Sequence, residues 1–252
     1  VFSPGITDIL QDTAGEFSKY PGNEGSEGLR QAITDWIGRR YGVSLDAETN
    51  GMALCGTREG LYNAMMALCP ETKGGKKPKV LIPNPFYQVY MVAALSGGAD
   101  PVFLPATRET GFLPYLDTIS PKVLDDTAVV YLCSRSNTKG AVATKEYWAN
   151  LMALAEKHDF KIFADGCYSE ICRGKRPVGA LTVAQEVGAD PDRVVLFNSL
   201  SKRSNLPGLR SGLVASGPET IKRMKTLRNY AGSPLPMPLQ RDRKSTRLNS
   251  SH

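Results

Sequence analysis

Histidine is nearly absent from this chain, which has two in 252 residues, at positions 158 and 252. A Ser-His-Asp triad or a histidine-rich metal centre therefore has almost no material. The five cysteines include no CxxC pair and mostly lie inside apolar runs, which predicts reduced thiols and no bound metal. The glycine patterns GxxxxGKS/T and GxGxxG, which cradle nucleotide phosphates, are also missing.

Long apolar runs are missing as well. No uncharged apolar stretch approaches the roughly 18 residues of a membrane span, and the chain does not begin with the charged-then-apolar pattern of a signal peptide. We therefore expect a soluble, cytoplasmic protein with no membrane partner, which also suits reduced cysteines.

The excess of positive charge lies largely at one end of the chain. The formal net charge is +6, and it falls to +3 without residues 241–252, which carry four basic side chains and one acidic one. Only this tail carries the positive charge that would favour binding to nucleic acid, so we expect no nucleic-acid partner. The tail has no apolar periodicity, which predicts a non-native or disordered segment. Residues 1–240 are predicted to form one large domain.

Apolar runs alternate with helical stretches along this domain. The runs lie near 51–55, 79–83, 101–104, 127–132, 160–164, 193–197 and 212–215. Helical patterns cover 57–68, 146–157 and 218–230, and an apolar stripe runs from Leu29 to Ile37. This alternation predicts an α/β fold, a three-layer αβα sandwich around a mainly parallel seven-stranded sheet.

Polar residues gather where four of these runs end, at the edge where open α/β sheets bind ligands. Gly56, Thr57 and Arg58 join a strand to a helix, Asn137 and the pair Asp165 and Tyr168 follow two more strands, and Lys202 lies among hydroxyls and arginines. Together they match the parts of pyridoxal 5′-phosphate (PLP). A helix N-terminus suits the phosphate, a carboxylate keeps the pyridine nitrogen protonated, amide and phenol bind the ring oxygen, and a lysine forms the Schiff base.

In this order of motifs the chain resembles the fold-type I, class I/II aminotransferases over nearly all of residues 1–240. The resemblance implies that Lys202 is the catalytic lysine, acting with Asp165 and Tyr168. The residues that it assigns to the cofactor are Tyr20, Gly56, Thr57, Arg58, Tyr87, Asn137, Asp165, Tyr168, Ser199, Ser201, Lys202 and Arg210. Tyr87 would stack on the ring, and Tyr20 would reach the phosphate of a neighbouring subunit, which implies a homodimer with shared active sites.

Within the family, the segments Asn84–Gln88 and Ser201–Gly212 are most similar to succinyldiaminopimelate aminotransferases of bacterial lysine biosynthesis. Two motifs depart from the family pattern. Arg135 and Thr138 replace prolines around Asn137, and Gly166 replaces a glutamate after Asp165. The chain also looks like a fragment, with an incomplete N-terminal segment and most of a smaller C-terminal domain missing. We therefore expect the cofactor to be held imperfectly and the 252 residues to be weakly active or inactive.

The function that this resemblance implies is transfer of an amino group between an amino acid and a 2-oxo acid. A truncated or degenerate non-catalytic scaffold of the same fold, and a PLP-dependent lyase, remain alternatives. Taken singly, Asp165 could cap a turn, Asn137 could support its loop and Tyr87 could belong to the core. Cys167 is interpreted as packing, and His158 as a surface turn residue.

Overall fold

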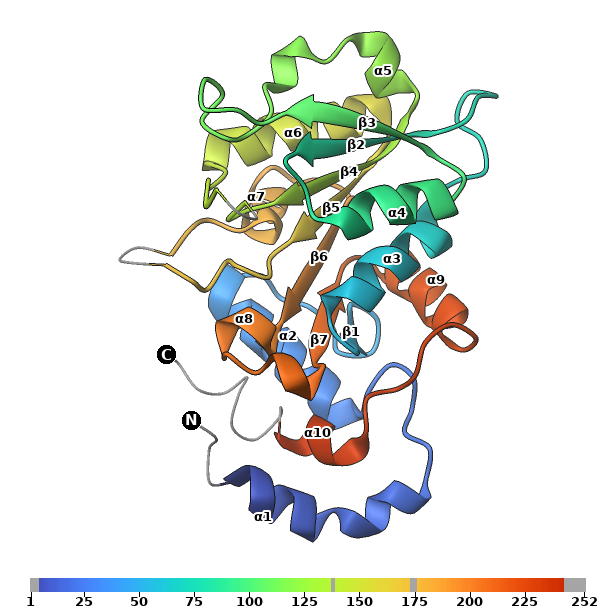
Figure 1. The fold of residues 1–252 in the computed structure, drawn as a ribbon, viewed down its shortest axis with the longest axis vertical. Helices are drawn as coiled ribbons and strands as arrows, with labels where there is room; N and C mark the ends of the chain where they lie inside the picture. Colours follow the sequence, from blue (N-terminus) through green and yellow to red (C-terminus); the bar gives the residue numbers. More distant parts are fainter. Residues whose placement is uncertain (1–4, 137–138, 173–175, 243–252) are drawn as a thin grey trace.

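A seven-stranded sheet with the order β1-β7-β6-β5-β4-β2-β3 runs through the molecule (Figure 1). The computed structural model describes residues 5–136, 139–172 and 176–242. The strands are β1 (Gly51–Leu54), β2 (Lys79–Asn84), β3 (Asp100–Pro105), β4 (Thr127–Cys133), β5 (Lys161–Asp165), β6 (Val194–Ser199) and β7 (Gly212–Ala215). All seven predicted strands are confirmed.

The sheet is mainly parallel, as predicted. Strands β2 to β6 pair in parallel with their neighbours, and β7 runs antiparallel to both β6 and β1. The register aligns Cys133 with Asp165 and Asp165 with Phe197. The carboxyl ends of β4, β5 and β6 therefore lie level along one edge of the sheet, and this edge receives the polar turns.

Helices cover both faces of the sheet (Figure 1). One face packs on α3 (Thr57–Leu68), α4 (Gln88–Ser96) and α9 (Pro218–Arg228), and the other on α2 (Glu27–Tyr41), α6 (Lys145–His158) and α7 (Ala180–Glu186). Alternate residues of β4 enter the two cores: Val129 and Tyr131 face α3 and α4, whereas Val130 and Leu132 face α6. This three-layer arrangement confirms the predicted αβα sandwich.

The remaining helices are short, and the sequence patterns did not predict them. They are α1 (Gly5–Asp12), α5 (Pro121–Asp125), α8 (Leu200–Arg203) and α10 (Met237–Asp242). Helices α4 and α7 were also missed. The sequence of α4 is apolar almost all round and has no amphipathic period, and α7 has only seven residues. Helix α10 includes the first two residues of the predicted tail, and the other ten lie outside the described residues.

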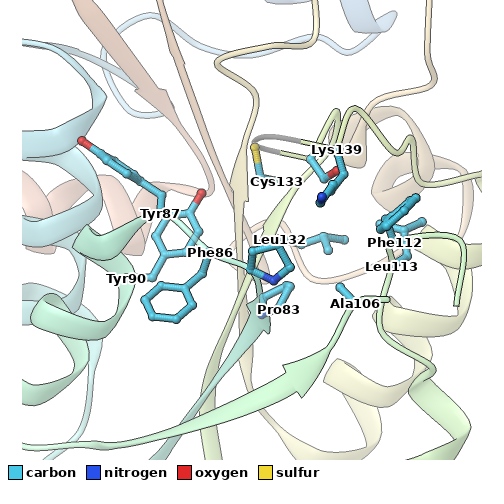
Figure 2. Close-up of a pocket in the computed structure, with 12 residues that line it drawn as sticks. Pro83, Phe86, Tyr87, Tyr90, Ala106, Phe112, Leu113, Leu132, Cys133 and Lys139 are labelled. Carbon is cyan, nitrogen blue, oxygen red and sulfur yellow. The ribbon is translucent and has the colours of Figure 1, made fainter. Parts of the chain in front are cut away.

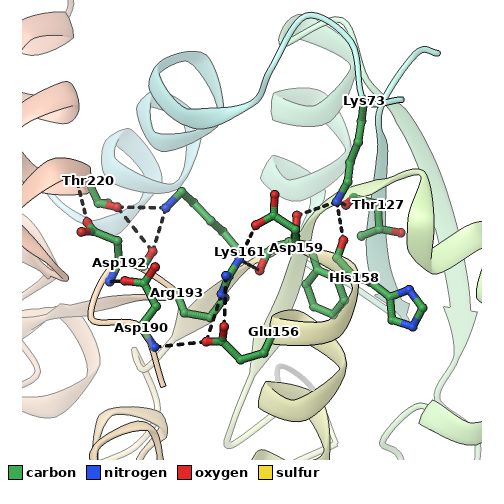
Figure 3. Close-up of polar contacts among 11 residues, drawn as sticks. Lys73, Thr127, Glu156, His158, Asp159, Lys161, Asp190, Asp192, Arg193 and Thr220 are labelled. Atoms are coloured by element: carbon green, nitrogen blue, oxygen red, sulfur yellow. Dashed lines mark hydrogen bonds and ion pairs between the residues drawn. The ribbon is translucent and has the colours of Figure 1, made fainter. Parts of the chain in front are cut away.

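Charged side chains at the opposite, amino edge of the sheet are tied to backbone carbonyls (Figure 3). Lys73 Nζ donates to the carbonyls of Thr127, His158 and Asp159 at 2.5, 2.6 and 2.5 Å. Lys161 Nζ donates to the Asp192 carbonyl at 2.7 Å. Since all three N–H groups of Lys73 are used, this network joins the loop before β2 to β4 and α6 and leaves Lys73 no donor for a ligand.

His158 differs from its predicted place in a surface turn. Its side chain is buried at the end of α6, and Nδ1 lies 2.6 Å from Oδ1 of Asp125. The prediction was wrong because the helix extends one residue further than its periodicity indicated, which turns the imidazole toward α5. In the described part of the chain, no helix is both long and apolar enough to cross a bilayer.

Candidate cofactor site

A guanidinium lies against the start of α3, where a helix N-terminus offers free N–H groups. Gly56 precedes this helix with a φ of 91°, and a Cβ atom there would lie 2.4 Å from Nη2 of Arg210. Nη2 of Arg210 also donates to the carbonyl of Cys55 at 3.3 Å. Glycine is therefore required for both the positive φ and the close approach of the arginine.

Hydroxyl groups at the start of α3 and at the end of β6 extend this positively charged corner. Ser199 ends β6 and caps α8, where its Oγ accepts the backbone N–H of Ser201 at 3.3 Å. The hydroxyl of Thr57, the first residue of α3, lies 2.9 Å from Sγ of Cys167. The same sulfur is 3.7 Å from Oγ of Ser199. We call Gly56, Thr57, Ser199, Ser201 and Arg210 the anion cradle.

A buried carboxylate lies at the end of β5. Asp165 is 5% exposed. Its Oδ2 accepts the hydroxyl of Tyr90 at 2.6 Å, and its Oδ1 accepts the backbone N–H of Cys167 at 3.0 Å. Burial, and then the neighbouring Asp165 charge, raise the pKa of Tyr90 well above its usual value. Tyr90 therefore stays a neutral donor and fixes the orientation of the carboxylate.

The candidate nucleophile lies beside the phenol that follows this carboxylate. Lys202 is exposed on α8, and its Nζ is 5.8 Å from the ring centroid of Tyr168. The next residue, Arg203, places its guanidinium 4.5 Å from the ring centroid of Trp36 on α2. This cation–π contact holds the short helix that carries Lys202 against the core.

Aromatic residues line a small neighbouring pocket that opens to solvent (Figure 2). Tyr87 and Tyr90 form one wall, and the hydroxyl of Tyr87 accepts the Nε–H of Arg58 at 2.9 Å. Arg58, which was predicted to hold a phosphate, is exposed and uses its Nε–H for this contact. On the opposite wall, Nζ of Lys139 is 5.5 Å from the ring centroid of Phe112.

Two predicted site residues are not placed with the others. Tyr20 is fully exposed, before the start of α2, which fits no role within a single copy of the chain. Asn137 lies outside the described residues. The structure also adds Tyr90, which was given no role, and Cys167, which was interpreted as packing. Tyr90 follows Tyr87 by three positions, about one turn of a helix. Because α4 was not predicted, this spacing did not indicate that the two side chains lie on the same side.

A buried ion pair supports the turn between β1 and α3. Arg228 is 2% exposed, and its Nε lies 3.1 Å from Oε1 of Glu59. The other carboxylate oxygen of Glu59 accepts the backbone N–H of Cys55 at 2.6 Å. The guanidinium of Arg228 also donates to the carbonyls of Ala53 and Ser233. The ion pair thus fixes the backbone that leads into the anion cradle.

The sequence profile of the aminotransferase class I and II family matches residues 6–241 of this fold. The chain belongs to this family. An LL-diaminopimelate aminotransferase of Dehalococcoides mccartyi is 32% identical over 225 residues, which are 88% of this chain and 55% of that protein. Another, from Desulforudis audaxviator, is 33% identical over 85% of this chain and 53% of its own length. The chain thus spans about half the length of these curated aminotransferases.

Solved aminotransferase structures superimpose closely on the chain. The enzyme from Neisseria meningitidis gives a TM-score of 0.90 at 37% identity, over 97% of this chain and 62% of that one. The aminotransferase AspB from Helicobacter pylori gives 0.88 at 31% identity, over 97% and 64%. The class I and II aminotransferases are PLP-dependent enzymes, so the cofactor expected from the sequence is the one that this family uses.

The residues present fit PLP. The glycine turn before α3, together with the three hydroxyl residues and the guanidinium of the anion cradle, forms a donor set suited to a phosphate dianion. Asp165 is a buried acceptor held at a strand end, as a protonated ring nitrogen requires. Lys202 supplies the amine.

We expect the buried ion pair below the anion cradle to be essential for stability. Arg228→Met leaves the Glu59 carboxylate buried without its cation, which should lower the free energy of unfolding by about 3 to 5 kcal/mol. Urea unfolding followed by circular dichroism measures this change. The matched control is Arg223→Met, which alters an exposed arginine on the same helix and should stay within about 0.5 kcal/mol of the unaltered chain. Equal stability of the two variants would contradict the role of the pair.

Proposed function

We propose that the chain binds PLP and serves the transfer of an amino group from an amino acid to a 2-oxo acid. The observation that carries this proposal is the convergence of Lys202, buried Asp165 and the anion cradle at one edge of the sheet. These groups come from the turns that follow β1, β5 and β6 and from the segment before β7. A non-catalytic scaffold of the same fold would not need a buried carboxylate fixed by two donors.

When bound, PLP supplies an electron sink that stabilises the negative charge left when a proton leaves Cα of the amino acid. Lys202 would hold the cofactor covalently through its amine. When it is not bound to the cofactor, the amine of Lys202 would serve as the base that takes the Cα proton of the amino acid. The exposure of Lys202 on α8 leaves its amine room to move between these two tasks.

Asp165 would keep the ring nitrogen of the cofactor protonated. A carboxylate beside a protonated nitrogen favours the charged pair, and the hydrogen bond from Tyr90 and the Cys167 N–H prevent Asp165 from turning away. Thr57, Ser199 and Arg210 would bind the phosphate and thereby orient the ring. Tyr87 lines the neighbouring pocket, where its ring would be available to stack on the ring of the cofactor.

The role of Lys202 predicts a covalent link that survives reduction. After incubation with PLP and borohydride, peptide mass spectrometry should find the cofactor on Lys202, and the absorbance band of PLP bound covalently to protein should appear before reduction. Lys202→Ala should lose both signals. Lys222→Ala, which removes an exposed lysine of α9, should keep both. Labelling spread over many surface lysines, with none on Lys202, would refute the assignment.

The choice of substrate is a narrower proposal. We infer an amino acid of the diaminopimelate class, because relatives named LL-diaminopimelate aminotransferase match most of this chain at 32–33% identity. The PLP-loaded protein should then change its absorbance with LL-diaminopimelate at lower concentrations than with leucine. An equal response to both amino acids would count against this choice.

A homodimer with shared sites is also proposed. Tyr20 is fully exposed and Phe17 is 63% exposed, and both lie before the start of α2. Aromatic side chains so exposed are suited to contact a second copy. Analytical ultracentrifugation should show a dimer, and Tyr20→Phe should weaken PLP binding while the dimer persists, because only the hydroxyl is lost. If the unaltered chain is a monomer, or if Tyr20→Phe binds PLP as tightly as the unaltered chain, shared sites are contradicted.

A further inference from the structure

One thiol lies between the hydroxyls of two separate turns. Sγ of Cys167 is 2.9 Å from Oγ1 of Thr57 and 3.7 Å from Oγ of Ser199. The backbone N–H of the same residue donates to Asp165 at 3.0 Å. Cys167 therefore contacts the start of α3, the end of β6 and the buried carboxylate at once.

The number of hydrogens on each of these groups indicates which of them donates and which accepts. Oγ of Ser199 accepts the N–H of Ser201, so its own hydrogen remains to be donated. A thiol that donates to one hydroxyl leaves the hydrogen of that hydroxyl for another acceptor. Burial, and then the charge of Asp165, raise the pKa of Cys167 far above its usual value. The sulfur thus stays neutral and adds no negative charge beside a phosphate.

We propose that Cys167 is a positioning residue for the anion cradle. Its S–H donates to Oγ1 of Thr57 at 2.9 Å, and its sulfur packs against Oγ of Ser199 at 3.7 Å. Both hydroxyls thereby keep their own hydrogens for a phosphate group, while the backbone N–H of Cys167 aligns Asp165. Binding of PLP by the anion cradle rests on the proposed function. The effect of the thiol on the two hydroxyls does not, because it should change the affinity for any phosphate group. Cys167 therefore does more than the packing that its sequence context predicted.

The first test measures inorganic phosphate and PLP separately. Cys167→Ala removes the contact to both hydroxyls and should raise the dissociation constants of inorganic phosphate, by calorimetry, and of PLP, by absorbance, about fivefold to tenfold. Cys167→Ser restores a polar group that reaches Thr57 and should recover most of this loss. The matched control is Cys172→Ala, five residues along the same segment, which should change neither constant.

A second test reads the thiol directly. Methyl methanethiosulfonate reacts with the thiolate, so it should modify the neutral Cys167 only slowly. Inorganic phosphate or PLP should slow this reaction further, because the occupied hydroxyls restrict access to the sulfur. Modification of Cys172 in the same sample should not change. Peptide mass spectrometry measures both rates, and it does so without any turnover.

The outcomes separate this inference from the proposed function. If Cys167→Ala binds phosphate as tightly as the unaltered chain, or if Cys167→Ser loses as much affinity as Cys167→Ala, the positioning role is overturned, whatever PLP does. If phosphate binding follows the expected order but reduction fixes no PLP on Lys202, the positioning role stands and the proposed function fails. Should Cys167→Ala unfold, the serine variant and the labelling rates still decide.

Discussion

The parallel alignment of β4, β5 and β6 is the constraint on which the site depends. Backbone pairing sets Cys133 opposite Asp165 and Asp165 opposite Phe197, so the turns after these strands leave the sheet at one level. Strand β7 runs the other way, which brings Gly212 against Gly56: a Cβ on Gly212 would lie 2.9 Å from the Gly56 backbone. Strand pairing alone thus brings together Gly56 and Gly212, which are more than 150 positions apart in the sequence.

The electrostatics of the site follow from where charge is buried and where it is exposed. The charges inside are paired or hydrogen-bonded: Glu59 with Arg228, and Asp165 with a phenol and an N–H. The groups suited to meet an anionic ligand, Lys202 and Arg210, are exposed. Because exposed cations keep their hydration, they cost little stability before a ligand arrives, whereas the buried acid is fixed in advance.

The fold was predictable from the sequence because its strands are short buried runs separated by amphipathic helices, and hydrophobic periodicity reports both. The positions of Asp165, Lys202, Thr57 and Ser199 at strand ends followed from the same pattern. What could not be predicted depends on contacts across the sheet. The sequence places Cys167 beside Asp165, but its distance to Thr57 arises only when β1 and β5 are brought to one edge. His158 likewise depends on where α6 ends.

Tyr90 shows how the core and the site are coupled. Its ring stacks on that of Tyr131 with centroids 4.4 Å apart, and Tyr131 meets Phe163 edge-on at 5.3 Å. Its hydroxyl binds Asp165, which follows Phe163 by two residues on β5. Two neighbouring strands thus fix Tyr90, β4 through stacking on Tyr131 and β5 through the hydrogen bond to Asp165. Because a close-packed aromatic row cannot shift without opening a void, the direction of the Asp165 carboxylate is set by the core rather than by its own short side chain.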